Sequence, residues 1–153
     1  MSEPTRNKDP LSLEPEFRAG LLRFIADVNK RFPRYKMTLG EGKRSADRQN
    51  WLFHQNTRTR WVTNCDGFKA LSMHQYTIAG DLVLVYKATP FIAIWDARVW
   101  RTVYAAFKLS DYGLELIPQE LVHVQKLGSQ AHFNVNTGRL EPEYVHKYKL
   151  PSL

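Results

Sequence analysis

Apolar residues recur at helical spacing near the start of the chain. Between residues 15 and 32 they fall three or four positions apart, at Phe17, Leu21, Phe24, Ile25, Val28 and Phe32. This spacing gathers them on one face and predicts an amphipathic helix. Pro15 suits the first turn of that helix, where a missing N–H is tolerated, and Pro33 ends the run.

Two further helices are predicted from their N-capping residues. Ser45 is suited to cap a short helix over residues 46–55, and Asp96 is suited to cap a longer helix that ends near Leu109. Gly113 is expected to close the longer helix, because glycine readily adopts the left-handed conformation that often follows a helix.

Strand-like segments lie between and after these helices. Runs of β-branched and aromatic residues predict strands at 35–39, 79–86, 90–95, 114–117, 121–125 and 131–135. Strands and helices mix without a regular βαβ alternation, which favours an α+β fold. A polar and aromatic loop over residues 56–73 stands between two predicted elements, and loops of that length are often functional.

Length and composition indicate one globular domain. The chain has 153 residues, of which 43% are hydrophobic and 24% charged, and these proportions suffice for a core of its own. We expect a single domain over residues 1–153, whose first twelve residues form a loose lead. The single cysteine, Cys65, excludes an intrachain disulfide and a cysteine-based zinc cluster. Any bound metal must therefore be held by imidazoles and carboxylates.

The charge distribution narrows the choice of partners. A formal net charge of +7 favours an anionic partner, but the basic residues are scattered, which argues against a dedicated nucleic-acid face. The first fifteen residues are polar and lack the apolar segment of a secretory signal, and the longest apolar stretches are too short to span a membrane. We therefore expect synthesis in the cytoplasm and no membrane insertion.

Two pairs of residues point to chemistry. His74 and Asp81 form the first pair, and Glu120 and His123 form the second. Two histidines and one carboxylate suit a metal ion that keeps one coordination position open for water. A carboxylate three residues before the last ligand suits a general base. Taken alone, the first pair also fits a polar loop residue and a strand cap, so its context decides.

That context is a series of motifs that follow one another between residues 38 and 125. They are Arg44-Ser45-x-x-Arg48-Gln49, Ser72-x-His74-x4-Ala79-x-Asp81, Gly113-Leu114-Glu115 and Glu120-x-x-His123-Val124-Gln125. The series resembles the zinc peptidases that cut peptidoglycan peptides: the D-Ala-D-Ala carboxypeptidases and L-alanyl-D-glutamate endopeptidases, including many phage endolysins. The family pattern is SxHxxGxAxD, followed later by an acidic residue three positions before a histidine.

The resemblance implies a fold and a metal site. His74, Asp81 and His123 match the Zn²⁺ ligands, and Glu120 matches the catalytic base. The implied architecture is a small domain with a central, mostly antiparallel sheet packed by helices, with the zinc site in a cleft on the sheet.

Three further positions match residues that support the family's site. Arg44 matches the arginine that holds substrate or stabilises the developing oxyanion, and Ser72 and Gln49 match supporting positions. The chain departs from the pattern at Thr77, where the family usually has glycine, so the backbone there must avoid a positive φ or tolerate strain. Residues 116–119 replace the family's tryptophan-glycine-glycine stretch.

His132 is an alternative third ligand, because Ala131-His132-Phe133 is similar to the last motif of many family members. The residue three positions before it is Ser129, which cannot act as a base, so His123 is preferred. Trp61, in the long loop, is the tryptophan best placed to contact substrate.

The function implied by the resemblance is hydrolysis of an amide bond in peptidoglycan stem peptides. An L-alanyl-D-glutamate endopeptidase is favoured over a D,D-carboxypeptidase. Small size and basic charge suit a monomeric phage or prophage endolysin that reaches the cell wall after a holin permeabilises the membrane. The partner is then the wall peptide and not nucleic acid. The alternative is a non-catalytic protein that keeps the fold and binds wall peptides, although a pure binder has no need for Glu120.

Overall fold

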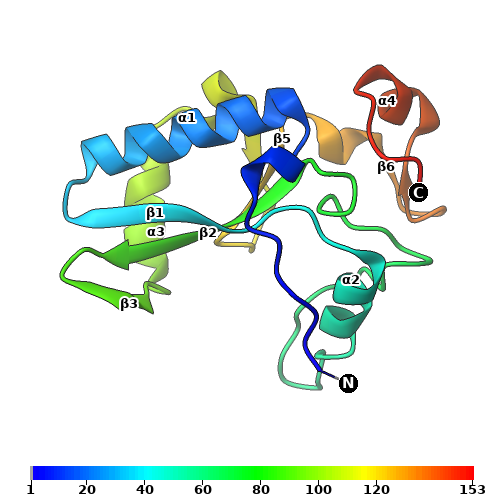
Figure 1. Ribbon diagram of the computed structural model, residues 1–153, viewed down its shortest axis with the longest axis horizontal. Coiled ribbons are helices and arrows are strands. Elements are labelled where there is room, and N and C mark those ends of the chain that lie inside the picture. Colours follow the sequence, from blue (N-terminus) through cyan, green and yellow to red (C-terminus); the bar gives the residue numbers. More distant parts are fainter. Residues whose placement is uncertain (1) are drawn as a thin grey trace.

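A central sheet has the strand order β1-β2-β5-β4, and β3 pairs with β2 beside this path (Figure 1). Its strands are β1 (Tyr35–Glu41), β2 (Ala79–Tyr86), β3 (Thr89–Ala93), β4 (Leu114–Leu116) and β5 (His123–Lys126). All paired strands of this sheet are antiparallel. The computed structural model describes residues 2–153. Helices complete an α+β fold, which confirms the fold class predicted from the sequence.

Two helices build the main core with the sheet. Residues of α1 (Pro15–Arg31) and α3 (Ala97–Ala105) belong to one buried apolar cluster, and Phe24 of α1 stacks on Tyr104 of α3 with ring centroids 6.2 Å apart. The remaining helices are α2 (Ala46–Phe53) and α4 (Pro142–Lys147). None of the helices in the described part of the chain is long and apolar enough to cross a membrane.

The side chains of β2 and β5 alternate between the two faces of the sheet. Leu82, Leu84 and Val124 belong to the core that α1 and α3 cover, and each is at most 2% exposed. Asp81 and His123 precede Leu82 and Val124 and therefore face the opposite side, where they are register partners on adjacent strands. The apolar pattern that builds the core thus also sets two chemical groups side by side.

A β-bulge turns a third group toward the same face. Leu39 pairs with Leu82 and Glu41 pairs with Asp81, so β1 uses one residue more than β2 over this step. The extra residue is Gly40, and it reverses the alternation of side chains along β1. Glu41 thereby comes to lie beside Asp81 instead of entering the core.

The segment predicted as one long helix after Asp96 is divided in two. α3 ends at Ala105, and a 3-10 helix, Leu109–Tyr112, follows it. The break lets the ring of Phe107 meet an aromatic ring of α1 edge-on in the core. Gly113 ends the 3-10 helix with a φ of 67°, so it has the predicted conformation but closes a different element.

The strand predicted at residues 131–135 is shorter than expected. A 3-10 helix, Ser129–His132, precedes the two-residue strand β6 (Phe133–Asn134), which pairs with β7 (Arg139–Leu140). Gly138, with a φ of 66°, takes part in the tight turn between them. The helix α4 after β7 was not predicted; its buried Tyr144 packs in a second, smaller apolar cluster.

The N-terminal segment, predicted to be a loose lead, is attached to the domain at several points. The N–H of Gly42 donates to the carbonyl of Asn7 at 2.7 Å, and the guanidinium of Arg48 donates to Glu3 at 2.8 Å. Pro10–Ser12 forms a 3-10 turn. These contacts fix the segment beside the end of β1 and the start of α2.

Gly20 in α1 is a position where helix propensity and packing disagree. A β-carbon here would collide with the backbone carbonyl of Tyr112. We expect Gly20→Ala to lower the free energy of unfolding by about 1–3 kcal/mol through overpacking, although alanine favours a helix over glycine by roughly 1 kcal/mol. Ala19→Gly at the exposed neighbouring position is the control for propensity alone. Denaturant unfolding measures both, and a stabilised Gly20→Ala variant would contradict the close packing.

Candidate metal centre

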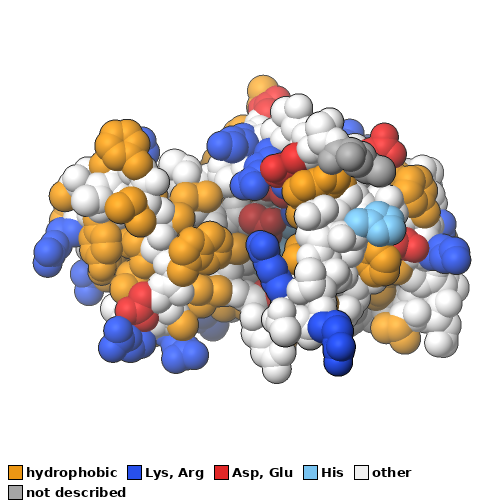
Figure 2. Space-filling model, turned by 90° about the horizontal axis from the view of Figure 1, so that it is seen from below, with side chains coloured by type: hydrophobic (Ala, Val, Ile, Leu, Met, Phe, Trp, Pro, Cys, Tyr) orange, Lys and Arg blue, Asp and Glu red, His pale blue; other side chains and the backbone are white. Residues whose placement is uncertain are grey.

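A cleft of about 720 Å³ lies on the side of the sheet that Asp81 and His123 face. The neighbouring ends of β2 and β5 contribute these two residues to it, and the loop between α2 and β2 contributes residues 60–65. Figure 2 shows this side of the molecule, with a hollow between the β3 end and the α2 end in which an acidic side chain is visible. The long loop noted in the sequence therefore lines a site.

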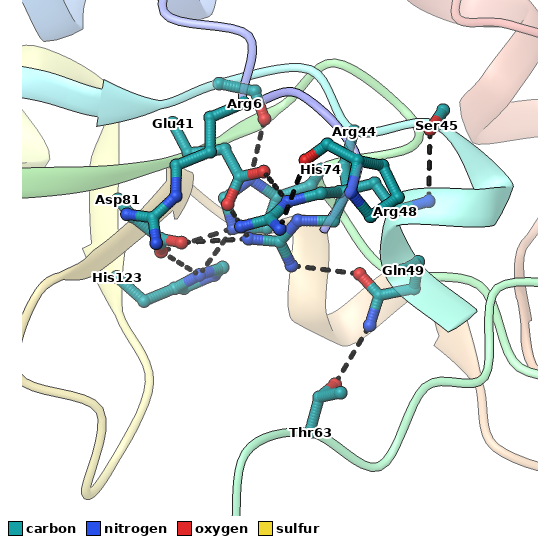
Figure 3. A network of polar contacts seen from close by, with 12 residues as sticks. Arg6, Glu41, Arg44, Ser45, Arg48, Gln49, Thr63, His74, Asp81 and His123 are labelled. Atoms are coloured by element: carbon teal, nitrogen blue, oxygen red, sulfur yellow. Dashed lines mark hydrogen bonds and ion pairs between the residues drawn. The ribbon is translucent and has the colours of Figure 1, made fainter. Parts of the chain in front are cut away.

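His74, Asp81 and His123 bring three ligand atoms together in the cleft (Figure 3). His74 Nε2 lies 3.2 Å from His123 Nδ1, and each of these nitrogens lies 3.3 Å from Asp81 Oδ1. A tetrahedron around an ion with bonds of about 2.0 Å has edges of about 3.3 Å. The spacing of the three atoms therefore fits a zinc-sized ion whose fourth position stays open.

The outer ring nitrogens determine which nitrogen of each histidine is available to a metal. His74 Nδ1 donates to the carbonyl of Gly42 at 2.7 Å, and His123 Nε2 donates to Gln125 Oε1 at 3.1 Å. Gln125 in turn donates its amide group to Glu115 at 3.0 Å, which fixes the orientation of that amide. Both imidazoles thus direct a lone pair into the cluster, as metal-ligating histidines do.

Burial and charge shift the pKa values of all three residues. Burial lowers the pKa of His74, and the charge of Asp81 only partly offsets this effect. Burial acts in the same direction on His123, but the hydrogen bond to Asp81, the charges of Asp81 and Glu120 and the hydrogen bond to Gln125 together outweigh burial and raise its pKa. Burial acts to raise the pKa of Asp81, yet the two histidines hold it well below its ordinary value. An ionised carboxylate beside a neutral imidazole suits a divalent cation.

Arg44 supports Asp81 from the segment between β1 and α2. Its Nη2 donates to Asp81 Oδ2 at 2.9 Å and to Glu41 Oε2 at 2.8 Å, and its Nη1 donates to Gln49 Oε1 at 2.9 Å. Both terminal nitrogens are engaged, so the guanidinium holds the Asp81 oxygen that does not face the histidines. The family resemblance implies that Arg44 holds substrate or stabilises the oxyanion, and the geometry shows that it also positions Asp81.

Glu41 lies between two buried arginines. Besides its contact with Arg44, its Oε1 accepts a hydrogen bond from Arg48 Nε at 2.7 Å, and all three side chains are at most 7% exposed. Burial acts to raise the pKa of Glu41, but the two guanidiniums outweigh burial and lower it. The carboxylate thus neutralises charge that would otherwise be buried next to the candidate metal ligands.

Glu120 lies at the edge of the cluster, in the loop between β4 and β5. Its Oε2 is 3.6 Å from His123 Nδ1, and its side chain is 29% exposed. A carboxylate at this distance can take a proton from a molecule on the open side of the three ligand atoms. The structure thus brings the predicted base beside the predicted ligands.

The two supporting residues named from the sequence also border the cluster. Gln49 is fully buried and connects Arg44 to the long loop, because its Nε2 donates to the Cys65 carbonyl at 2.8 Å and to Thr63 Oγ1 at 3.1 Å. Ser72 lines the cleft, and among the described residues its buried hydroxyl has no hydrogen-bond partner. Such a hydroxyl is suited to bind a polar group of a ligand.

His132, the alternative third ligand, lies outside the cluster. Its Nδ1 contacts Glu141 Oε2 at 2.9 Å, and its ring stacks on Tyr144 with centroids 4.6 Å apart. His123 is thus the histidine that meets His74.

Thr77, which stands where the family usually has glycine, has a positive φ of 67°, so its backbone tolerates strain. Its N–H donates to the His74 carbonyl at 3.2 Å, and its carbonyl accepts from the N–H of Glu14 at 2.9 Å. These bonds hold a β-branched residue in the left-handed region, which such residues rarely adopt. The turn after His74 therefore has a left-handed residue at this position although the residue is not glycine.

Sequence reasoning gave no role to two residues that hold the cluster in place. Gln125 orients His123, and a signal for it existed, because two residues separated by one position on a strand share a face. Glu41 had no such signal, since regular alternation along β1 places it on the core side. Only the bulge at Gly40 brings it next to Asp81.

Comparison with known proteins identifies a fold relative. The structure is similar to the crystal structure of the Serratia marcescens L-Ala D-Glu endopeptidase ChiX, with a TM-score of 0.52 and 14% sequence identity. The likeness covers 84% of this chain and 95% of that chain, and at this identity it shows a shared fold. No protein-family model matches the sequence, and no curated protein sequence matches it.

Zinc binding tests the assignment of the ligands. We expect the purified protein to bind one Zn²⁺. Loss of a residue that only hydrogen-bonds to a ligand typically weakens metal binding by roughly 10- to 100-fold, and we expect His74→Ala and His123→Ala to weaken it by more. His132→Ala is the matched control and should bind zinc like the wild type. Isothermal titration calorimetry measures all four proteins. Loss of zinc in the His132 variant alone would show that the wrong histidine has been chosen.

The buried charge network makes Glu41 a stability determinant. We expect Glu41→Gln to lower the free energy of unfolding by about 3–5 kcal/mol, because the substitution leaves two buried guanidiniums without their shared carboxylate. Glu143→Gln, on the exposed side of α4, should change it by about 0.5 kcal/mol or less. Both variants are measured by denaturant unfolding of metal-free protein. Equal effects would show that the network adds nothing.

The same variant has a pH dependence of known sign. The pKa of Glu41 is lowered from its ordinary value of 4.5, so its contribution to stability is complete above pH 4.5 and is lost as the pH falls through the folded-state pKa. The difference in unfolding free energy between wild type and Glu41→Gln should therefore shrink below pH 4.5. A difference that grows on acidification is incompatible with an ionised Glu41.

Proposed function

We propose that this protein is a zinc-dependent peptidase that hydrolyses an amide bond in peptidoglycan stem peptides. The observation that carries the proposal is the convergence of His74, Asp81 and His123 beside the carboxylate of Glu120. A structural zinc site usually fills all four positions with protein ligands, whereas a hydrolytic site keeps one open and places a base next to it. The fold likeness to an L-Ala D-Glu endopeptidase supports the choice of substrate.

Different residues of the cleft would have different roles in hydrolysis. A bound Zn²⁺ would supply a Lewis acid for the scissile carbonyl and would lower the pKa of the attacking water. Glu120 would accept a proton from that water and pass it to the leaving amine. Arg44 keeps Asp81 in one orientation, and the hydroxyl of Ser72 is available to a polar group of the peptide.

We favour the bond between L-alanine and D-glutamate as the site of cleavage. Arg60 lines the cleft and is exposed, whereas Arg6 lines it while paired with Glu3, so Arg60 offers positive charge to an acidic residue of the substrate. We also propose a role as a monomeric phage or prophage endolysin that is made in the cytoplasm and reaches the wall after membrane permeabilisation. The net charge of +7 supports binding to an anionic cell envelope.

Peptidoglycan digestion tests the role of Glu120. We expect the wild type to release peptides with new amino termini, and we expect a chelator to abolish this release. Glu120→Gln should lower the rate by about 10²- to 10⁴-fold because the general base is lost, while zinc binding is kept. Glu143→Gln should behave like the wild type. Mass spectrometry of the products and calorimetry with zinc provide the two measurements.

The products also identify the bond. Peptides that begin with D-glutamate support an L-alanyl-D-glutamate endopeptidase, whereas free D-alanine indicates a carboxypeptidase. If the wall peptides bind to the zinc-loaded protein but stay intact, the protein is a binder and the proposed activity is wrong.

A further inference from the structure

Two exposed tryptophans line the cleft from distant parts of the chain. Trp61 belongs to the loop between α2 and β2 and is 55% exposed, and Trp95 follows β3 and is 70% exposed. In Figure 1, α2 and β3 lie toward opposite ends of the molecule, so the two segments approach the cleft from different sides. Large apolar rings left in water beside a binding cleft indicate a surface for a ligand.

Each tryptophan is tied to the fold, Trp61 through its ring and Trp95 through its position in the chain. The ring N–H of Trp61 donates to Asn64 Oδ1 at 2.8 Å. Trp95 stands between Ile94, which is buried in the core, and Asp96, which caps α3 with its carboxylate. The bond to Asn64 limits the freedom of the Trp61 ring, and the neighbours of Trp95 fix its backbone, which lowers the entropy lost when a ligand binds.

The stem peptide offers little for these rings to contact. The two residues that flank the proposed cleavage site carry a methyl group and an acidic side chain. In peptidoglycan, however, the same L-alanine is joined to N-acetylmuramic acid, so the glycan strand lies one residue away from the bond. Sugar rings have apolar C–H faces that pack on aromatic faces while their hydroxyl groups stay in water. A cleft of about 720 Å³ is also larger than a dipeptide needs.

We propose that Trp61 and Trp95 bind the glycan strand beside the stem peptide, so that the protein acts on peptides still attached to sugar. This inference rests on the proposed function and names the form of its substrate. Two more exposed apolar residues lie close to Trp95 in the sequence, Phe91 and Ile92 of β3, which are 95% and 66% exposed. Figure 2 shows hydrophobic side chains gathered at the β3 end, along which a longer glycan would extend.

Binding to matched ligands tests the proposal. The ligands are the dipeptide L-Ala-D-Glu and the same dipeptide attached to the disaccharide N-acetylglucosamine–N-acetylmuramic acid. Zinc-loaded Glu120→Gln protein is used, so that hydrolysis does not interfere, and calorimetry gives the affinities. We expect the disaccharide form to bind at least about tenfold more tightly. Trp61→Ala and Trp95→Ala should each remove about three- to tenfold of this preference, the size of one aromatic contact.

Phe68 provides the control variant. It lies in the same loop as Trp61 and is 53% exposed, but it does not line the cleft. Phe68→Ala should keep the full preference for the disaccharide form. Thermal unfolding of each variant shows whether the fold is intact. Because each variant loses one exposed ring, its unfolding temperature should stay close to that of the wild type.

The outcomes separate this inference from the proposed function. Equal affinity for the two ligands overturns the glycan contact, even if the wild type cleaves peptidoglycan. A preference that depends on the tryptophans supports the contact, even if no cleavage occurs. A dimer that dissociates on Trp95→Ala, seen by analytical ultracentrifugation, would assign the ring to self-association and overturn the proposal as well.

Discussion

The carboxylate of Asp81 is the group on which the geometry of the site depends. Its Oδ1 faces His74 and His123 at 3.3 Å, and its Oδ2 accepts a hydrogen bond from Arg44 at 2.9 Å. Because both oxygens are engaged, the carboxylate cannot rotate freely, and the direction of Oδ1 is set before a ligand arrives. The backbone position of Asp81 is in turn set by Leu82, which is buried in the core on the other face of β2.

A chain of alternating charges extends this constraint away from the cleft. Successive partners lie 2.7–2.9 Å apart, in the order Asp81, Arg44, Glu41, Arg48 and Glu3. Buried charges are tolerated when each has a partner, so removal of one member exposes the others to the full cost of burial. The candidate metal ligands are therefore oriented in part by a segment at the start of the chain, which lies outside the motifs that carry the family resemblance.

The sequence predicted those features whose signal is local. Helix α1 and strand β2 were placed within one residue, because apolar spacing reports directly which side chains are buried. The order of the motifs predicted the three residues whose ligand atoms lie close together in the structure. The break after α3, the bulge before Glu41 and the left-handed Thr77 were beyond such reasoning. Each depends on contacts between distant segments: an aromatic cluster, a register shift and a hydrogen bond from the start of α1.

Asp81 and His123 are cross-strand neighbours, and this arrangement affects the kinetic stability of the folded protein. An ion held by both would be a reversible cross-link between β2 and β5, where the two halves of the sheet meet, and His74 would attach the long loop to the same point. Separation of these strands would then require release of the ion. Metal supply would thus govern resistance to local opening and to proteases as well as chemistry, and the loaded protein would be the longer-lived one.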